Sequence, residues 1–224
     1  MGLAIPQVIT PSKASGAQVI DGSLKFDSSN STYLQRSQGA GNRRTFTVSA
    51  WIKRGRNAPD AGHDWFSASE GDTTGGTDYG FGIRFYKSDH STHPDRLMIF
   101  EYENGAFKLR YISDRRFSDT GFYHLVVAVD TTQSTAANRV RAYINGDEVT
   151  EWRSGYVTDP SEDLELTTNE SGKNSQIGTS VSDGSTIVQR ADGYASNFYL
   201  IDGQALDASY FGFTDPLTNT WKPK

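Results

Sequence analysis

The chain has 224 residues, of which 35% are hydrophobic and 12% aromatic, and its formal net charge is −5 at pH 7. This length is one that all-β sandwiches and barrels commonly fill as a single domain, so we expect one core. The absence of cysteine excludes disulfides and thiolate metal sites. Positive and negative residues are interspersed without a basic block, and no apolar run approaches the roughly 20 residues of a membrane span, so we expect neither nucleic-acid binding nor a span.

Residues 1–21 are predicted to form an N-terminal arm, because Pro6, Pro11 and Gly16 interrupt scattered apolar residues there. The start lacks the charged region and unbroken apolar run of a secretory signal. We expect the arm to dock on its own domain or on a neighbouring protein, and residues 22–224 to form one domain.

A series of short strands separated by turns is predicted from Leu24 onward. Apolar and polar residues alternate at 24–26, 46–52 and 81–85, which predicts half-buried strands. The stretch LMIFEYENGAFKLRYI predicts a hairpin that turns at Asn104-Gly105, a dipeptide suited to a type I′ turn. Residues 124–130, HLVVAVD, are apolar on both faces, which predicts a central strand covered on both sides.

The second half of the chain continues the β pattern. RVRAYINGDEV predicts another hairpin, with one solvated face and a turn at Asn145-Gly146. Residues 153–175 lose periodicity and are predicted to be mainly loop, with at most a short strand at 164–166. A last strand is expected at 195–202, followed by one helical turn capped by Asp207. The fold class that follows is all-β, an antiparallel two-sheet sandwich with almost no helix.

Four segments resemble successive strands of laminin-G-like jelly-roll domains in the concanavalin A-like superfamily: SLKFDSSNSTYL, FTVSAWIKRG, GFYHLVVAVD and RVRAYINGDEV, in this order. The closing stretch DGYASNFYLIDGQALDASYFGFTDPLTNTWKPK is similar to a pattern at the end of jelly-roll proteins of marine phages, particularly cyanophages. The resemblance covers about residues 22–224. It implies two facing antiparallel sheets, one of them concave, with rim loops where many relatives bind carbohydrate.

Paired carboxylates would be needed for glycoside hydrolysis, about 5 Å apart for retention or about 6.5–9.5 Å apart for inversion. The glucanase branch of the resembling superfamily carries them as E-x-D-x-x-E or E-x-D-x-E on one strand. The acidic cluster at 162–165 has the wrong spacing for either form. Glu101 and Glu103 share a strand face but lie beside a hairpin turn, so we interpret both as solvated surface residues. We therefore assign no catalytic residue.

Two groups could in principle ligate a metal, although neither has a recognised spacing: His63, Asp64, Glu70 and Asp72 in GHDWFSASEGD, and His90 with His93. We favour polar loops for both groups. The resemblance adds three candidates for a calcium site, Asp183, Asp192 and Asp202. Each precedes a glycine, which is also common turn chemistry. We assign no metal ligand and no cofactor.

Aromatic residues offer the other route to a binding site. Trp65, Tyr79, Tyr86 and Trp152 could stack on sugar rings if they are exposed, and burial in the sandwich is equally compatible with the pattern. His124 is expected to be structural, because no nucleophile motif accompanies it. The glycine-rich stretch TGGTDYGFG lacks the ending of a P-loop and predicts a rim loop. The ligand-binding residues stay unassigned.

The resemblance and the missing catalytic pattern together favour a non-enzymatic phage virion protein, either a capsid decoration protein or a small tail-associated appendage. Its expected partners are other virion proteins, contacted through residues 1–21, and further copies of itself, because particle sites are repeated. The alternative is a carbohydrate-binding lectin module that recognises a host surface glycan. A glycan-degrading enzyme is the third hypothesis, and it would need a convergent carboxylate pair.

Overall fold

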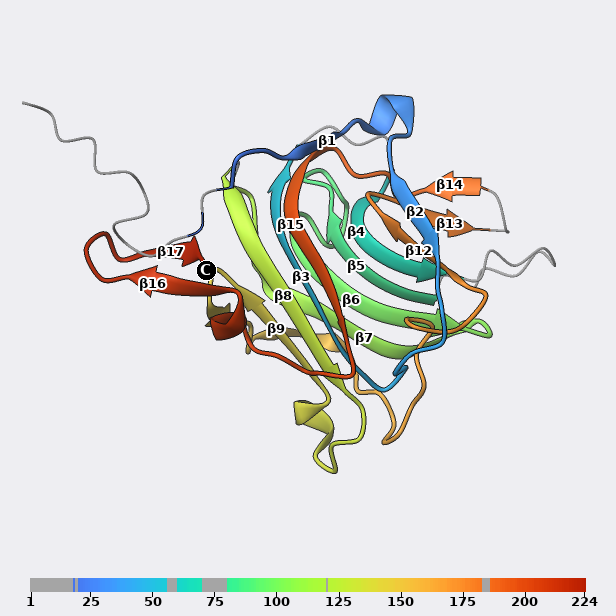
Figure 1. The fold of residues 1–224 in the computed structure, drawn as a ribbon. Coiled ribbons are helices and arrows are strands. Elements are labelled where there is room, and N and C mark those ends of the chain that lie inside the picture. Colours follow the sequence, from blue (N-terminus) through green and yellow to red (C-terminus); the bar gives the residue numbers. More distant parts are fainter. Residues whose placement is uncertain (1–17, 19, 56–59, 70–79, 120, 183–185) are drawn as a thin grey trace, which may run out of the picture.

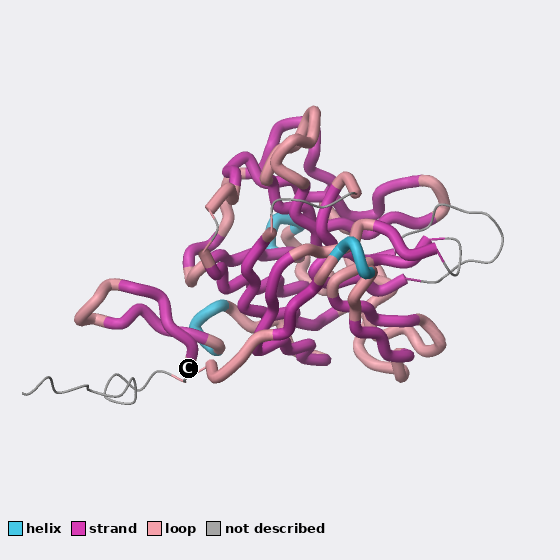
Figure 2. The backbone as a smooth tube through the Cα atoms, turned by 90° about the horizontal axis from the view of Figure 1, so that it is seen from above, coloured by secondary structure: helices cyan, strands magenta, loops and turns pink. Residues whose placement is uncertain are grey.

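The computed structural model describes residues 18, 20–55, 60–69, 80–119, 121–182 and 186–224, so nearly all of the predicted arm lies outside the described residues. In this part of the chain two large antiparallel sheets face each other (Figure 1), which confirms the predicted all-β sandwich. Figure 2 shows a backbone of strands and loops with only short helical turns. No helix within the described ranges has the length and apolarity that a membrane span requires.

The strands are named in spatial order within each sheet. The six-stranded sheet contains β1 (Leu24–Phe26), β15 (Gly193–Asp202), β3 (Thr45–Arg54), β8 (Phe122–Asp130), β9 (Val140–Ile144) and β10 (Asp147–Glu148). The seven-stranded sheet contains β11 (Trp152–Thr158), β7 (Ala106–Arg116), β6 (Arg96–Glu103), β5 (Gly80–Tyr86), β4 (Gly62–Ser69), β12 (Asn174–Ile177) and β2 (Leu34–Ser37). Two further hairpins are β13 (Ser180–Ser182) with β14 (Thr186–Val188) and β16 (Gly212–Asp215) with β17 (Thr220–Pro223). The 3₁₀ turns are η2 (Ser28–Asn30), η3 (Ala136–Asn138) and η4 (Ala208–Tyr210).

The main core fills the space between the two large sheets. The inward residues of β3 and β8 face the phenylalanines of β5, and the rings of Phe46 and Phe81 meet edge to face at 5.3 Å. Phe85 and Phe117 make a second edge-to-face pair at 5.5 Å. Such aromatic pairs contribute about 0.5–1.5 kcal/mol beyond the area that they bury. The period of two predicted for these strands therefore places their side chains correctly.

Both predicted Asn-Gly turns are confirmed. Asn104 and Gly105 have φ values of 51° and 74°, and Asn145 and Gly146 have values of 52° and 88°. Two successive positive φ values define the type I′ turn, whose twist matches that of the strands it joins. The 3₁₀ turn η4 also forms as predicted, because the Asp207 carboxylate accepts a hydrogen bond of 2.8 Å from the Ser209 amide.

The hairpin β16–β17, red in Figure 1, packs on the outer face of the six-stranded sheet. Trp221 and Phe211 cover Val126 of β8 and Tyr143 of β9, and Trp221 Nε1 donates a hydrogen bond of 3.0 Å to His124 Nδ1. β8 is thus covered on both sides, as its apolar sequence predicted. The fully solvated face expected for β9 is wrong, because Tyr143 lies beneath this hairpin.

The prediction for residues 153–175 is also partly wrong. Residues 152–158 form β11, which pairs with β7 at the edge of the seven-stranded sheet, whereas 164–166 is not a strand. The register shifts between Trp152 and Val157, and such a bulge interrupts the side-chain alternation by which strands are recognised. Leu166 is nonetheless fully buried, as part of a loop that packs on the main core.

A matched pair of substitutions tests how Trp221 holds the C-terminal hairpin. A Cβ added at Gly146 would lie 2.5 Å from the Trp221 ring, whereas one added at Gly105 meets no atom within 4 Å. Gly105→Ala should cost about 1–2 kcal/mol, for left-handed backbone strain alone. Gly146→Ala should cost about 1–3 kcal/mol more, because the ring must move. Urea denaturation measures both, and equal losses would contradict the contact.

Candidate functional site

A second apolar cluster lies on the outer face of the seven-stranded sheet, separate from the main core. Met98, Phe100 and Ile112 of β6 and β7 are buried there, although their strand neighbours Ile99 and Tyr111 point into the sandwich. Partly exposed rings pack against this cluster: Tyr86, Tyr102, Phe107 and Tyr156. Apolar residues on both faces of β6 therefore create an aromatic surface on the outside of the molecule.

One arginine on this surface is fixed by an internal ion pair. Arg84 of β5 binds the fully buried Asp64 of β4 through two hydrogen bonds of 2.5 and 2.9 Å, and its guanidinium lies 4.9 Å from the Phe100 ring centre. Asp64 can stay charged inside the protein because this bidentate partner replaces its water. The pair closes the apolar cluster on the β4 side.

Two other arginines flank the ring of Tyr156. The guanidinium groups of Arg110 and Arg153 lie 5.3 and 5.1 Å from the ring centre, within cation–π distance. Arg110 donates to the Gly155 carbonyl at 3.2 Å, and its buried Nε has no partner. Among the described residues neither arginine forms an ion pair with a carboxylate. We call Tyr86, His93, Arg110, Arg153 and Tyr156 the Tyr156 patch.

The histidine of this patch is held neutral. Burial lowers the pKa of His93 to about 4, and the charges of Arg153, Arg96 and Arg110 lower it further. Its Nδ1 lies 2.9 Å from Arg153 Nη1, so an unprotonated Nδ1 accepts this hydrogen bond. The charged neighbours that act on His93 are cations, which makes this patch electropositive on a chain of net negative charge.

The structure separates the four aromatic residues proposed from sequence. Trp65 is buried in the main core and Trp152 packs against that core, whereas Tyr86 belongs to the Tyr156 patch. Tyr79 and most of the predicted rim loop lie outside the described residues. Sequence reasoning missed Arg110, Arg153 and Tyr156. Alternation with Leu109 and Tyr111 could have placed Arg110 on the outer face, but the other two belong to the unpredicted strand β11.

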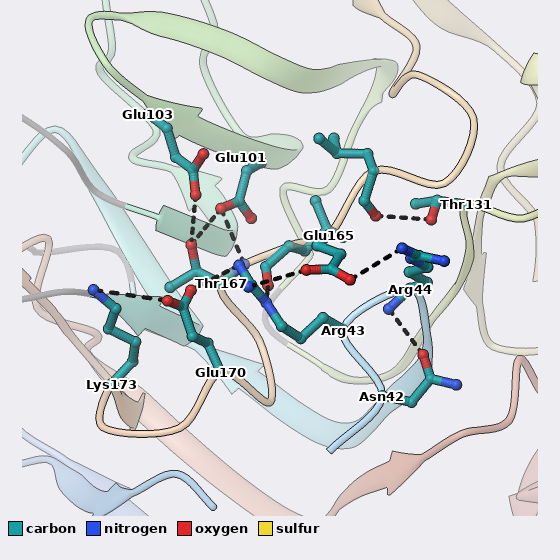
Figure 3. A network of polar contacts seen from close by, with 12 residues as sticks. Asn42, Arg43, Arg44, Glu101, Glu103, Thr131, Glu165, Thr167, Glu170 and Lys173 are labelled. Carbon is teal, nitrogen blue, oxygen red and sulfur yellow. Dashed lines mark hydrogen bonds and ion pairs between the residues drawn. The ribbon is translucent and has the colours of Figure 1, made fainter. Parts of the chain in front are cut away.

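The surface position predicted for Glu101 is wrong. Glu101 follows Leu97 and Ile99 on the inward face of β6 and is 1% exposed. Its Oε1 accepts hydrogen bonds from the Thr167 amide, at 3.1 Å, and from the Thr167 hydroxyl, which also lies 3.2 Å from Glu103 (Figure 3). Burial raises the pKa of Glu101 well above its usual range, and the charge of Glu103 adds to this effect.

The loop that carries Thr167 is fastened by Arg43. The Arg43 Nε donates to the Leu166 carbonyl at 2.7 Å, and its Nη2 pairs with Glu170 at 2.7 Å. Figure 3 shows these contacts side by side with the Glu101–Thr167 bonds. Glu101 thus joins β6 to this loop and faces away from the outer surface of the sheet.

The metal hypotheses find little support in the geometry. The polar loop expected at His63 and Asp64 is wrong, because both lie in β4 and are fully buried. His63 accepts from the Asp192 amide, and Asp64 binds Arg84. The Asp202 carboxylate accepts from the Asn42 amide at 2.7 Å. Within the described ranges no group of three metal-ligating side chains converges; three of the candidates lie outside these ranges: Glu70, Asp72 and Asp183.

Comparison with protein families matches residues 27–209 to the Laminin_G_3 family, described as the concanavalin A-like lectin/glucanases superfamily. The chain belongs to this superfamily. The match spans the described strands from η2 to η4, so the superfamily fold includes both large sheets and the Tyr156 patch. A comparison with curated protein sequences gives no match.

Solved structures of the same fold include proteins from several organisms. The heptameric SAP-like pentraxin of Limulus polyphemus has a TM-score of 0.52 at 21% identity, over 81% of this chain and 72% of the pentraxin chain. The CBM40 of Ruminococcus gnavus IT-sialidase, bound to α2,3-sialyllactose, has a TM-score of 0.56 at 13% identity, over 80% and 95%. The K499G mutant of Streptococcus pneumoniae NanB sialidase has a TM-score of 0.56 at 14% identity, over 88% and 29%. These identities establish a shared fold.

Glu101 makes the stability of this superfamily member depend on pH. A folded-state pKa raised above the unfolded value of about 4.5 means that stability is complete below pH 4.5 and falls as pH rises through the folded value. Glu101→Gln should therefore match the wild type near pH 4 and exceed it at about pH 8 by at least about 1 kcal/mol, or about 2–4 °C in Tm.

Thermal unfolding of the wild type and Glu101→Gln across this pH range measures the effect. Glu165→Gln is the control, because Glu165 is half exposed in its pairs with Arg43 and Arg44 and should change stability by less than about 1 kcal/mol. Parallel curves for wild type and Glu101→Gln at all pH values would contradict the burial of a raised-pKa carboxyl.

Proposed function

We propose that the protein is a non-enzymatic carbohydrate-binding module whose ligand contacts the Tyr156 patch and carries a carboxylate. The observation that carries this proposal is the pair of arginines, Arg110 and Arg153, on either side of one partly exposed tyrosine ring. Neither has a carboxylate partner within the described part of the chain. A ligand can supply that partner.

The aromatic rings of the outer face fit the apolar side of a sugar. Tyr86 and Tyr156 are partly exposed and stand over a buried apolar cluster, so their rings keep a fixed orientation. A flat ring with an apolar face and a polar edge suits a pyranose, which itself has apolar C–H faces and polar edges. Aromatic walls with a few placed polar groups are the usual composition of a small-ligand site.

The charge of the patch favours an acidic sugar over a neutral one. Guanidinium groups bind carboxylates through paired, charge-assisted hydrogen bonds. His93, neutral because its pKa lies near 4, can accept or donate a hydrogen bond without adding charge at neutral pH. The sialyllactose bound by the CBM40 of Ruminococcus gnavus IT-sialidase, which has the same fold, adds support.

The non-enzymatic part of the proposal rests on the position of the carboxylates. Glycoside hydrolysis requires two of them beside the bond that is cleaved. Glu101 is buried on the inward face of β6, where no ligand on the outer face reaches it, and Asp64 is occupied by Arg84. The Tyr156 patch itself contains cationic, aromatic and histidine side chains.

Calorimetric titration of the full chain with 3′-sialyllactose and with lactose tests the proposal. We expect sialyllactose to bind more tightly than lactose, and Arg110→Gln or Arg153→Gln to weaken it about tenfold to hundredfold, the effect of one charged hydrogen bond. Tyr156→Ala should weaken both sugars. Arg141→Gln is the control, since Arg141 lies on the six-stranded sheet and pairs with Glu148.

A glycan array extends the test to other acidic sugars. Binding to acidic glycans that is lost in Arg110→Gln and kept in Arg141→Gln supports the proposal. Equal binding of neutral and acidic glycans, or no binding to any glycan, contradicts it.

The finer part of the proposal is that this module is a virion component of a phage, a capsid decoration or small tail-associated protein attached through residues 1–21 and present in several copies. Its support is the closing sequence 192–224, which resembles phage jelly-roll proteins. In the fold this stretch supplies β15 and the hairpin that covers β8, so the resemblance concerns a structural feature of the domain.

Cryo-electron microscopy of phage particles that carry this chain tests the placement. We expect density for the sandwich on the particle surface and for residues 1–21 against the capsid or tail. Absence of the chain from purified particles would contradict the virion role and leave the glycan-binding proposal standing.

A further inference from the structure

An apolar groove runs along one open edge of the sandwich, far in the topology from the Tyr156 patch. It lies between β1 and β15 of one sheet and β12 and β2 of the other, and consists of two cavities of about 320 and 440 Å³. Both are lined by Leu34, Ile177 and Phe198, so they form one continuous space, which we call the edge groove. Further apolar walls are contributed by Leu24, Phe26, Phe66, Ala195 and Leu200.

The backbone explains why the sandwich stays open here. The edge strands β1 and β2 are only three and four residues long. The β15 register shifts between Ser196 and Tyr199, and Phe198 in this bulge lies against Phe66, with ring centres 5.8 Å apart. Bulges redirect side chains in this way. The main core is therefore continuous with a surface where Leu24 and Leu34 are 56% and 48% exposed.

One end of the edge groove is polar and cationic. Ser175 is 6% exposed and lines the groove, and its hydroxyl is buried without a hydrogen-bond partner. Arg36 lies directly opposite Ser175 in the β2–β12 register and also lines the groove. Within the described residues Arg36 forms no ion pair. A buried hydroxyl without a partner costs stability, so its position against a free guanidinium indicates a missing acceptor.

We propose that the edge groove binds a monomeric aliphatic carboxylate, a medium-chain fatty acid. Its hydrocarbon chain lies along Leu34, Ile177 and Phe198, and its carboxylate accepts hydrogen bonds from Arg36 and Ser175. The volume falls within the roughly 300–1,000 Å³ typical of small-ligand pockets, and apolar walls with a few polar groups are their usual composition. This inference is independent of glycan binding, because it uses the opposite edge of the seven-stranded sheet.

Calorimetric titration of the full chain with octanoate, decanoate and dodecanoate, at concentrations where each is monomeric, tests the proposal. We expect saturable binding of one molecule per chain that tightens about fourfold for each added methylene. Decanoate should bind about tenfold more tightly than decanol, and Arg36→Gln should remove this preference while leaving decanol unchanged. Ile177→Trp, which fills the groove, should abolish binding of both.

Leu217→Trp is the matched control, because Leu217 is 89% exposed on the hairpin turn and does not line the groove. Circular dichroism shows whether each variant is folded, and Arg36→Gln changes an exposed side chain, so it keeps the test decisive if Ile177→Trp unfolds. Absence of saturable binding, or equal binding of decanoate and decanol, overturns the proposal. A concentration-dependent dimer lost in Ile177→Trp, without decanoate binding, overturns it in favour of a second copy of the chain.

Discussion

The contact between the inward faces of β3 and β8 and the phenylalanines of β5 is the interaction on which the rest of the structure depends. It joins the two sheets through rings and branched aliphatic side chains, and it orients every strand that pairs outward from these three. Because successive residues of a strand point to opposite faces, fixing Phe46 and Phe81 inward also fixes which residues of the neighbouring strands point outward. The position of Arg110 and that of Glu101 both follow from this constraint.

Both sheets carry large apolar residues on their outer faces as well, and the protein covers the two faces differently. On the six-stranded sheet the chain's own hairpin lies over Val126 and Tyr143. On the seven-stranded sheet the cover is a layer of tyrosines, histidines and arginines over Met98 and Phe100. An arginine over a ring satisfies the apolar face with its carbon stem and keeps a charge near the surface. The second face can therefore be closed and still recognise an anion.

Much of the fold could be predicted from sequence, because β3, β8 and the two Asn-Gly hairpins show regular alternation or a specific turn dipeptide. β11 could not, since its bulge breaks the alternation between Trp152 and Val157. Glu101 shows a different limit: its spacing from Leu97 and Ile99 indicated an inward position, but a carboxylate beside a turn is usually solvated. Its partner Thr167 lies 66 residues away, and a contact of that kind has no local pattern in sequence.

The pairing of β3 with β15 has a consequence for synthesis. These strands are neighbours in the six-stranded sheet, yet Thr45–Arg54 must wait for Gly193–Asp202 before its second edge is filled. Chains grow at about 5–20 residues per second, so the apolar β3 and β8 are exposed as an incomplete sheet for many seconds while the later strands are translated. A strand with an unpaired edge is a template for other chains. In a cell, the yield of this protein therefore depends on protecting that half-built sheet on the ribosome.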